Sequence, residues 1–520
     1  MAYPPVVPAA APRRRPWSLA LLVALHAAAL GCDGPSASGA ELDGSAPSAA
    51  EPSAAASSEP GPPRSQPEAR HEPEALEPAS APPTASAGSS PPSGASPEPP
   101  PRTEPLEHRR ALRPLMVYVE PRLGAEFRGK IPLHEVFELY ERVPGEDCGG
   151  EGWGRVAAAA YVCLHHSEPT DDTPMVLPRR IPDGLAPFYY ARLQPKDASG
   201  NNPPAPRYRS RTAMRRGAAA ESFLEREHDY AFVDRRRFRD GAVLYAHDDR
   251  VVRESDVLRK EPSDFAGRDT LERPIPEGAV MGWSITWPHA IVRAEPHADA
   301  EERGRLPLHE ELLLRGEPRV EHGETWQPVE SPAAGWVLAD EIRWWVPMDP
   351  PTELRADEIW LDVDLDQQML ALRRGPAVEM LTLVSSGNWK HGTPVGLFRI
   401  EGKWAWADMR SRAGDDEAYF VEGVPWVQYF RGRYALHGTF WHNRFGRRTS
   451  HGCINLSAHD ARWVYERTSP VSKPGFVTTN EHAVEPGTVL RIRKGTTAPP
   501  DRRRPPIGTP SRATSLHLAP

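Results

Sequence analysis

One cysteine and two histidines around residue 450 have the types and spacing needed for covalent catalysis. Cys453 has His451 two residues before it and His437 sixteen residues before it, and an apolar run directly precedes His437. A nucleophilic thiol needs a base within hydrogen-bond reach and amide donors for the developing oxyanion. Gly438 and Gly452 allow tight turns and a close approach of backbone to a substrate. The stretch therefore predicts covalent catalysis with Cys453 as the nucleophile, and a strand that delivers His437.

The residues around this cysteine resemble a known catalytic signature. His-Gly-Thr at 437–439 and Ser-His-Gly-Cys-Ile-Asn-Leu at 450–456 are similar to the motif of the L,D-transpeptidases (YkuD-type catalytic domain), which build the bacterial cell wall and so its shape. Val-Asp-Leu-x-x-Gln at 363–368 and Thr-Pro-x-Gly-x-Phe at 393–398 extend the resemblance to roughly 355–495. A lone cysteine is more often a small buried hydrophobe, but this set of residues at fixed spacing favours the family.

The resemblance implies a role for each residue. Cys453 would be the nucleophile and His437 its base, oriented by the Gly438 carbonyl, and the backbone N–H groups of Gly452 and Cys453 are candidate oxyanion donors. The remaining substrate-site candidates are His451, Asn455, Thr439, Ser450, Trp441, Arg444 and Tyr429, with His442, Phe445 and Trp426 as further lining candidates. For the aromatic residues the alternative is core packing, and for His451 and Asn455 it is a local turn contact and a helix-entry position.

The family implies a reaction on peptidoglycan stem peptides without a metal or cofactor. The thiolate attacks the carbonyl that joins the third residue of a tetrapeptide stem to its terminal D-alanine, and an amine of another stem resolves the thioester into a 3→3 cross-link. Water instead would make the protein an L,D-carboxypeptidase, and a protein lysine would make it a protein-to-wall anchoring enzyme. The alternative from another class is a non-catalytic wall-binding lipoprotein. A papain-like protease is disfavoured, since its cysteine usually precedes its histidine.

Composition limits how much of the chain is packed core. Of 520 residues, 60 are proline and 39% are hydrophobic, so a good part of the chain should lie outside folded domains. The length predicts two to four domains. Net charge is −8 with both signs interspersed, and no basic patch argues for nucleic acid. A zinc site is disfavoured because His165 and His166 are adjacent rather than at finger spacing.

The N-terminus has the pattern of an export signal. Arginines at 13–15 precede an apolar run at 17–30 that is short for a membrane span. The run ends in Ala-Leu-Gly-Cys, which resembles a bacterial lipobox, although Ala29 stands where leucine is usual. Residues 1–32 are thus predicted to direct lipidation to Cys32, which implies a lipid-anchored protein of the cell envelope. The alternatives are a plain secretory signal or an uncleaved anchor.

Between the signal and the catalytic domain we predict a linker and small modules. Residues 33–108, rich in Ala, Pro, Ser and Glu, should be a disordered linker. Residues 110–168 show short strands in an order similar to bacterial SH3b modules, and Cys148 and Cys163 favour a disulfide over two free thiols in an oxidising compartment. Residues 286–348 look like a second module, because Leu-Pro-Leu-His-Glu at 306–310 echoes Ile-Pro-Leu-His-Glu at 131–135. These modules would bind wall peptides or position the catalytic domain, with simple spacing as the alternative. Residues 169–285 receive no functional assignment.

The predicted fold is mainly β: a β-sandwich-like L,D-transpeptidase domain at 355–495, preceded by small β-barrel modules and the disordered linker. Apolar residues alternate with Asp362 and Asp364, which predicts a half-buried strand. Residues 403–424 lack a period and are predicted to be a lid over the cysteine. Ser457 and Asp460 have capping-box spacing at the start of a helix that runs to about residue 467. The proline-rich, basic tail 496–520 is expected to be disordered.

Overall fold

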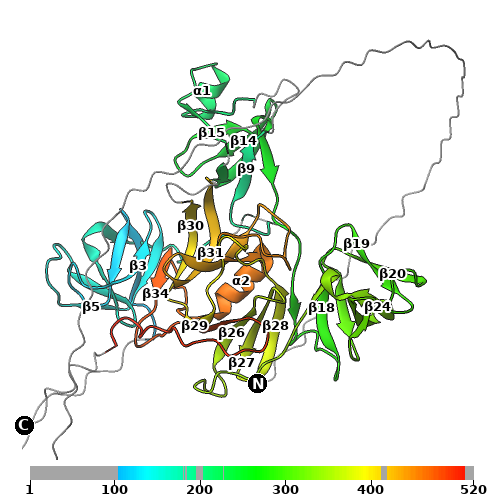
Figure 1. Cartoon of the computed structure of the whole chain (residues 1–520). Coiled ribbons are helices and arrows are strands. Elements are labelled where there is room, and N and C mark those ends of the chain that lie inside the picture. The colour runs from blue at the N-terminus through cyan, green and yellow to red at the C-terminus, as the bar shows by residue number, and fades with distance from the viewer. Residues whose placement is uncertain are drawn as a thin grey trace, which may run out of the picture. The chain divides into compact units, whose positions relative to one another are not determined.

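The computed structural model describes residues 103–179, 181, 184–194, 203–226, 228–411 and 418–509. The predicted signal segment, the lipidation site Cys32 and most of the predicted linker lie outside these residues. Strands dominate the described part, which confirms the predicted fold class (Figure 1). Neither helix in the described ranges is long and apolar enough to cross a membrane; the longer one has ten residues.

The C-terminal domain consists of two sheets around one apolar core. One sheet has the strand order β17-β28-β27-β26-β35-β29, and the other contains β34, β30, β31, β32 and β33 in that order. Helix α2 packs against β31, β32 and β33. The elements are β26 (Ile359–Asp364), β27 (Met369–Arg374), β28 (Ala377–Leu383), β29 (Gly396–Arg399), β30 (Gly402–Arg410), β31 (Phe420–Arg431), β32 (Tyr434–Thr439), β33 (Ile454–Ser457), α2 (Ala458–Arg467), β34 (Thr478–Asn480) and β35 (Val489–Arg493).

Helix α2 begins where the sequence predicts. The Ser457 side chain caps it by accepting a hydrogen bond from the Asp460 N–H at 3.1 Å. The Asp460 carboxylate is fully buried and accepts from the Gly267 N–H and from the Thr382 hydroxyl. It therefore joins the helix start to β28 and to the segment that contains the short strand β17 (Arg268–Asp269).

Three copies of one small β topology precede this domain, one more than the sequence suggests. We call them repeat 1 (107–169), repeat 2 (189–260) and repeat 3 (280–344). In each, the first strand pairs antiparallel with the fourth and the eighth: β1 with β4 and β8, β9 with β12 and β16, and β18 with β21 and β25. A 3-10 turn precedes the last strand in all three, at 164–166, 254–256 and 339–341. Repeat 2 lies within the region 169–285 that received no assignment.

The elements of the three repeats are as follows. Repeat 1 has β1 (Glu107–Ala111), β2 (Leu115–Tyr118), β3 (Phe127–Ile131), β4 (Val136–Leu139), β5 (Glu141–Val143), β6 (Trp153–Ala157), β7 (Ala160–Cys163) and β8 (Ser167–Pro169). Repeat 2 has β9 (Tyr189–Leu193), β10 (Pro206–Arg207), α1 (Arg211–Arg215), β11 (Ser222–Phe223), β12 (His228–Phe232), β13 (Asp234–Phe238), β14 (Gly241–Tyr245), β15 (Val251–Arg253) and β16 (Val257–Lys260). Repeat 3 has β18 (Val280–Ser284), β19 (His289–Arg293), β20 (Glu302–Pro307), β21 (Glu311–Leu314), β22 (Arg319–Glu321), β23 (Glu324–Ser331), β24 (Gly335–Leu338) and β25 (Ile342–Trp344).

The predicted disulfide between Cys148 and Cys163 forms in repeat 1 and is confirmed. The first linker residues described, 103–106, already run toward repeat 1, and β1 begins at 107, so the module starts slightly earlier than the predicted boundary of 110. The likeness of these modules to SH3b domains stays a prediction.

Each repeat is joined to the C-terminal domain by backbone pairing or a shared core. Strand β3 of repeat 1 pairs with β34, and Phe476 fills the core of repeat 1. Strand β12 of repeat 2 runs parallel to β31, and Tyr190 stacks on Phe440 with ring centroids 3.5 Å apart. Repeat 3 shares a core with the outer face of β27 and β28, where Trp283 and Trp345 are buried. From these contacts we expect the repeats and the C-terminal domain to unfold in one cooperative transition rather than as independent domains.

The alternating pattern predicts a half-buried strand, but the structure shows a buried ionic network at its acidic residues. Asp362 and Asp364 of β26 lie opposite Arg491 and Arg493 of the parallel strand β35, and the relative exposure of all four is at most 3%. Arg491 donates hydrogen bonds to both carboxylate oxygens of Asp362 at 2.9 and 2.6 Å, and Arg493 donates to Asp364 at 2.8 Å. The arginines also donate to carbonyl oxygens of residues 346, 348 and 349. The linker from repeat 3 thus covers the face that was expected to meet solvent.

The C-terminal tail is the second correction. We expected residues 496–520 to be disordered, but residues 500–502 pair with the edge strand β29. The Leu397 N–H donates to the Pro500 carbonyl at 2.9 Å, and the Arg502 N–H donates to the Leu397 carbonyl at 2.8 Å. Proline lacks an N–H, yet it is tolerated at a sheet edge, where its carbonyl alone can pair. The tail therefore protects an edge that would otherwise be open.

Removing one charge from the buried network tests how much the fold depends on it. We expect Asp362→Asn to lower the free energy of unfolding by about 3–5 kcal/mol, because it leaves buried guanidinium groups without their counter-charge. Urea unfolding followed by tryptophan fluorescence measures this. The exposed pair of Arg355 and Asp357 (79% and 84% exposed side chains) supplies the control, and Asp357→Asn should change stability by less than about 0.5 kcal/mol. Equal effects of the two variants would contradict the role given to the network.

Candidate active site

Two adjacent parallel strands bring the predicted nucleophile and base to one cavity. Strand β32 carries His437, β33 begins directly after Cys453, and the register places Leu436 opposite Ile454 and His437 opposite Asn455. Cys453 and His437 both line a cavity of about 1360 Å³. Of the other predicted site residues, Asn455, Ser450, His451, Trp441, Arg444 and Tyr429 also line it.

The His437 imidazole is held as a neutral base. It is 2% exposed, and its Nδ1 lies 3.1 Å from the Gly438 carbonyl oxygen, which can only accept a proton. Nδ1 therefore carries the hydrogen, and Nε2 keeps the lone pair. Burial lowers the pKa of His437 to about 4, so the ring stays uncharged at neutral pH. This is the orientation by Gly438 that the resemblance implies.

The Cys453 thiol is also neutral in the resting site. Its Sγ donates to the Arg433 carbonyl oxygen at 3.6 Å. The residue keeps partial exposure to the cavity, but burial of the thiol raises its pKa, and the Ala435 N–H and the charge of Arg433 offset this only in part. The structure therefore supports a neutral thiol and a neutral imidazole in one cavity, with proton transfer needed before attack, rather than a preformed thiolate–imidazolium pair.

The loop before Cys453 is closed by its own hydrogen bonds. The Ser450 hydroxyl donates to the Cys453 carbonyl at 2.6 Å and accepts from the Gly452 N–H at 3.0 Å. The Gly452 amide, predicted as an oxyanion donor, is thus already engaged, so this part of the prediction is corrected. Gly452 has φ +113, and a Cβ there would lie 2.6 Å from the Tyr434 ring. Only glycine fits this turn without displacing the strand that carries the base.

Polar residues that sequence analysis did not single out anchor the same loop. The Thr393 hydroxyl donates to the Gly452 carbonyl at 2.8 Å and accepts from the Gly387 N–H at 2.9 Å. Ser385 and Asn455 exchange two backbone hydrogen bonds of 2.9 Å. Ser385 and Gly387 follow β28, and Thr393 begins the Thr-Pro segment. Their role requires the tertiary approach of the end of β28 to β33, which no local spacing encodes.

The remaining predicted residues divide into lining and support. Asn455 is engaged with His442, its Nδ2 lying 2.9 Å from Nε2, and burial lowers the pKa of His442 to about 3. The Trp441 ring is 5.8 Å from that of His437. Thr439 is buried and does not line the cavity, and its hydroxyl has no hydrogen-bond partner among the described residues. Trp426 and Phe445 belong to apolar cores, as the alternative for the aromatic residues stated.

The predicted lid is a hairpin in its described part. Residues 402–410 and 420–431 form β30 and β31, and the ends of these strands line the cavity together with Ser411, Ala418 and Tyr419. The Tyr419 ring lies 5.0 Å from that of His451. The segment covers the site from one side, as expected, but it does so as paired strands whose alternation is masked by aromatic and polar residues.

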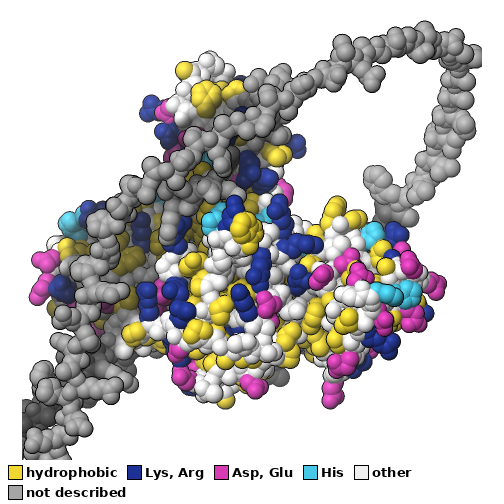
Figure 2. All heavy atoms as spheres, in the orientation of Figure 1, with side chains coloured by type: hydrophobic (Ala, Val, Ile, Leu, Met, Phe, Trp, Pro, Cys, Tyr) yellow, Lys and Arg dark blue, Asp and Glu magenta, His cyan; other side chains and the backbone are white. Residues whose placement is uncertain are grey.

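The cavity wall is cationic and extends beyond the catalytic domain. Among the described lining residues are seven cations, Arg192, Lys390, Arg410, Arg431, Arg433, Arg444 and Arg504, and two carboxylates, Asp229 and Asp408. Arg192 and Asp229 come from repeat 2, and Arg504 comes from the tail. Figure 2 shows a related contrast on one face: Lys and Arg gather over the central elements, and Asp and Glu gather over repeat 3. The site therefore suits a ligand that carries negative charge.

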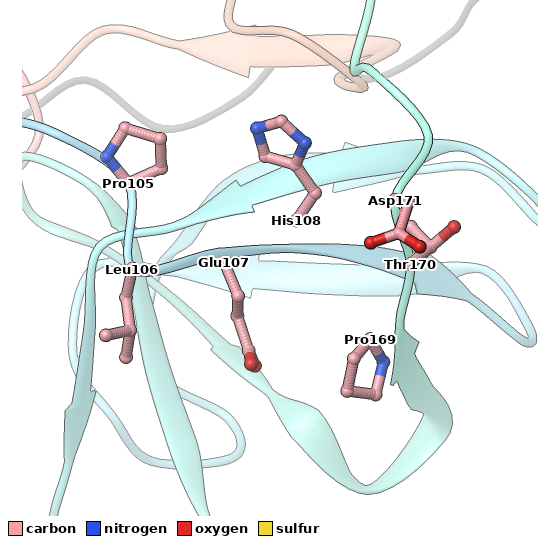
Figure 3. Close-up of a pocket in the computed structure, with 7 residues that line it drawn as sticks. All are labelled: Pro105, Leu106, Glu107, His108, Pro169, Thr170 and Asp171. Carbon is pink, nitrogen blue, oxygen red and sulfur yellow. The ribbon is translucent and has the colours of Figure 1, made fainter.

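A second hollow, of about 610 Å³, lies on repeat 1 between the start of β1 and the end of β8 (Figure 3). Glu107 and His108 point to opposite sides of β1 in this view, as successive residues of a strand do. Glu107 is engaged by Arg109 and Arg142. This hollow has no thiol beside a histidine, so it offers no counterpart to the chemistry at Cys453.

Comparisons with known proteins point to one family. Residues 358–492 match the family model described as L,D-transpeptidase catalytic domain (YkuD). "Putative L,D-transpeptidase YciB" of Bacillus subtilis (strain 168) is 26% identical over 131 residues, which cover 22% of this chain and 63% of that protein. A crystal structure of a mutant Enterococcus faecium L,D-transpeptidase is 20% identical, with coverage of 26% of this chain and 50% of that one and a TM-score of 0.21. L,D-transpeptidase 3 from Mycobacterium tuberculosis, with a faropenem-derived adduct, is 15% identical, with coverage of 39% and 93% and a TM-score of 0.22.

The family model and the match to YciB confirm the resemblance for the catalytic segment. The chain spans less than two thirds of YciB and half of the Enterococcus faecium chain.

The state of the thiol can be measured directly. We expect alkylation of Cys453 by iodoacetamide to accelerate with pH up to and beyond pH 9 without a plateau near neutrality, because only the thiolate reacts and burial raises its pKa. Mass spectrometry of the Cys453 peptide against time gives the rate at each pH. Glutathione is the reference, with a thiol pKa of about 8.5, and its rate should level off at lower pH than that of Cys453. A Cys453 plateau at pH 6–7 would instead reveal a stabilised thiolate.

Proposed function

Residues 358–492 are an L,D-transpeptidase catalytic domain of the YkuD type, and we propose that this chain forms 3→3 cross-links between peptidoglycan stems through Cys453. The observation that carries the proposal is the shared cavity of Cys453 and His437, set by the register of β32 and β33. The ordered Nδ1–H contact of His437 with Gly438 supports the base role, because it leaves Nε2 free to take a proton.

The first half-reaction transfers the stem to the enzyme. His437 Nε2 takes the proton of Cys453 as Sγ attacks the carbonyl carbon of the third stem residue, forming a C–S bond and an oxyanion. Because the Gly452 N–H is engaged by Ser450, the Cys453 N–H remains the candidate oxyanion donor in this loop. Collapse of the intermediate breaks the C–N bond to D-alanine, whose amine leaves with the proton from the His437 imidazolium. A thioester and free D-alanine result.

The second half-reaction releases the stem. The side-chain amine of a diamino acid residue on another stem gives a proton to His437 and attacks the thioester. The C–S bond breaks, the new amide is the cross-link, and the Cys453 sulfur regains a proton. Burial keeps the His437 imidazole unprotonated at neutral pH, so its Nε2 lone pair is available for both proton abstractions.

Three alternatives share this site. If water resolves the thioester the activity is that of an L,D-carboxypeptidase, and if a protein lysine does so the enzyme anchors proteins to the wall. A non-catalytic wall-binding lipoprotein would keep the repeats as the affinity elements. The presence of Cys453 and an oriented, neutral His437 in one cavity favours an enzyme over this last alternative.

Product analysis separates these outcomes. The full chain, incubated with a defined tetrapeptide muropeptide, should release D-alanine and yield 3→3 dimers, detected by mass spectrometry. Cys453→Ser should abolish the acyl adduct, and His437→Asn should lower the rate at least about a hundredfold, since a positioned base contributes about 10²–10⁴. His322→Asn, at an exposed histidine of repeat 3, is the matched control. Tripeptide without dimer would assign the carboxypeptidase reaction, and an unchanged product yield from Cys453→Ser would refute the mechanism.

We further propose that a lipid on Cys32 holds the enzyme at a membrane of the cell envelope. The support is the lipobox-like run at 29–32 that follows an apolar segment. The N-terminal peptide of protein from bacterial membranes should begin at Cys32 and carry the mass of acyl chains. Cys32→Ala should move the protein to the soluble fraction, since acyl chains supply the membrane affinity. Membrane retention of Cys32→Ala with no acyl mass in the parent would overturn this proposal.

A further inference from the structure

The C-terminal tail brings a charged side chain into the catalytic cavity from outside the matched domain. The tail pairs with Leu397 of β29, and farther on the Ala483 N–H donates to the Ile507 carbonyl at 2.7 Å. Arg504 lies between these two attachment points and lines the cavity that contains Cys453. The backbone of the tail is therefore held on both sides of Arg504, which keeps this residue at the cavity wall.

Neighbouring arginines of the tail differ in what engages them. Arg503 is paired with Asp501 at 2.7 Å and with Glu353, and its side chain is 14% exposed. Arg504 has a 70% exposed side chain, and its contact with Glu401 is at 4.0 Å. At that distance a carboxylate neutralises the guanidinium weakly, so most of the donors of Arg504 remain available to a ligand.

Three other cations of the cavity wall are more committed to the protein. Arg192 makes a two-pronged contact with the buried Asp229, at 2.9 and 2.5 Å. Arg410 lies over the Phe420 ring at 5.3 Å, and Arg433 donates to the Arg410 carbonyl at 3.1 Å. Arg504 thus combines a place in the cavity wall with weak engagement by protein groups.

We propose that Arg504 binds a free carboxylate of the stem peptide, so that the site selects stems whose carboxylates have not been converted to carboxamides. The inference rests on the proposed function, because it takes the stem as the ligand. A guanidinium matches a carboxylate with two parallel charge-assisted hydrogen bonds, whereas a carboxamide offers one acceptor and no charge. The described residues of the wall include more cations than carboxylates, which also favours a ligand with a free carboxylate.

Binding to a protein that cannot turn over tests this. In full-length Cys453→Ser, the affinity is measured by calorimetry at low salt for two synthetic tetrapeptides: one with all carboxylates free, and one with the carboxylates of its acidic and diamino acid residues amidated, except at the C-terminus. In the Cys453→Ser background, the further substitution Arg504→Gln should weaken binding of the peptide with free carboxylates about fivefold. It should weaken binding of the amidated peptide less than twofold. Arg504→Lys keeps the charge but loses the two-pronged geometry, so its affinity for the free peptide should fall between those of the parent and Arg504→Gln, and added salt should shrink the preference.

Arg355→Gln is the matched control, because it removes an equally exposed cation that does not line the cavity; it should leave both affinities unchanged. Equal loss on the two peptides with Arg504→Gln, or no loss on either, would overturn the inference, since a structural effect of the tail would not distinguish a carboxylate from its amide. Failure of the proposed function looks different: protein with Cys453 intact would release no D-alanine from either peptide, whatever their affinities.

Discussion

The parallel pairing of β32 with β33 is the constraint on which the site depends. Side chains alternate along a strand, so a slip of one residue would turn His437 from the cavity toward the core. The register is fixed from both sides: Asn455 exchanges backbone hydrogen bonds with Ser385, and apolar residues of β32 and β33 fill the same core as α2. A sixteen-residue separation in sequence thus becomes a fixed neighbourhood of thiol and imidazole.

The loop between these strands is held by parts of the chain outside the matched domain, which gives the repeats a physical role. Repeat 2 stacks Tyr190 on Phe440 at the start of the loop. Repeat 3 receives two hydrogen bonds from Arg447 at its Ile285 carbonyl and sends one from Arg343 to the Gly446 carbonyl. Positioning of the catalytic domain, one of the two functions expected of the small modules, therefore has a concrete basis in contacts around the loop that ends at Cys453.

Sequence reasoning succeeded where a local pattern carries the information and failed where distant segments meet. The Ser457 cap and the disulfide of Cys148 with Cys163 follow from short-range spacing and chemistry. The alternation around Asp362 predicted solvent on one face, because nothing near it reveals that Arg491 would pair with Asp362, and Arg493 with Asp364, each 129 residues later. The prediction of a disordered tail rested on its prolines, but composition cannot show that the folded domain has an open strand edge with which the tail can pair. Repeat 2 escaped notice because its equivalence with the others lies in strand pairing, and little of it in residue identity.

In the resting site, the thiol of Cys453 and the imidazole of His437 are both uncharged. Burial opposes ionisation of both groups, raising the pKa of Cys453 and lowering that of His437. A thiol held as thiolate would be open to oxidants and stray electrophiles, whereas a neutral thiol becomes nucleophilic only as its proton passes to His437. A carboxylate-bearing ligand among the cations of the wall would place the scissile carbonyl at the sulfur and exclude water from it. Burial of the thiol thus keeps it neutral, and the cationic wall would supply the preference for a charged ligand that we propose.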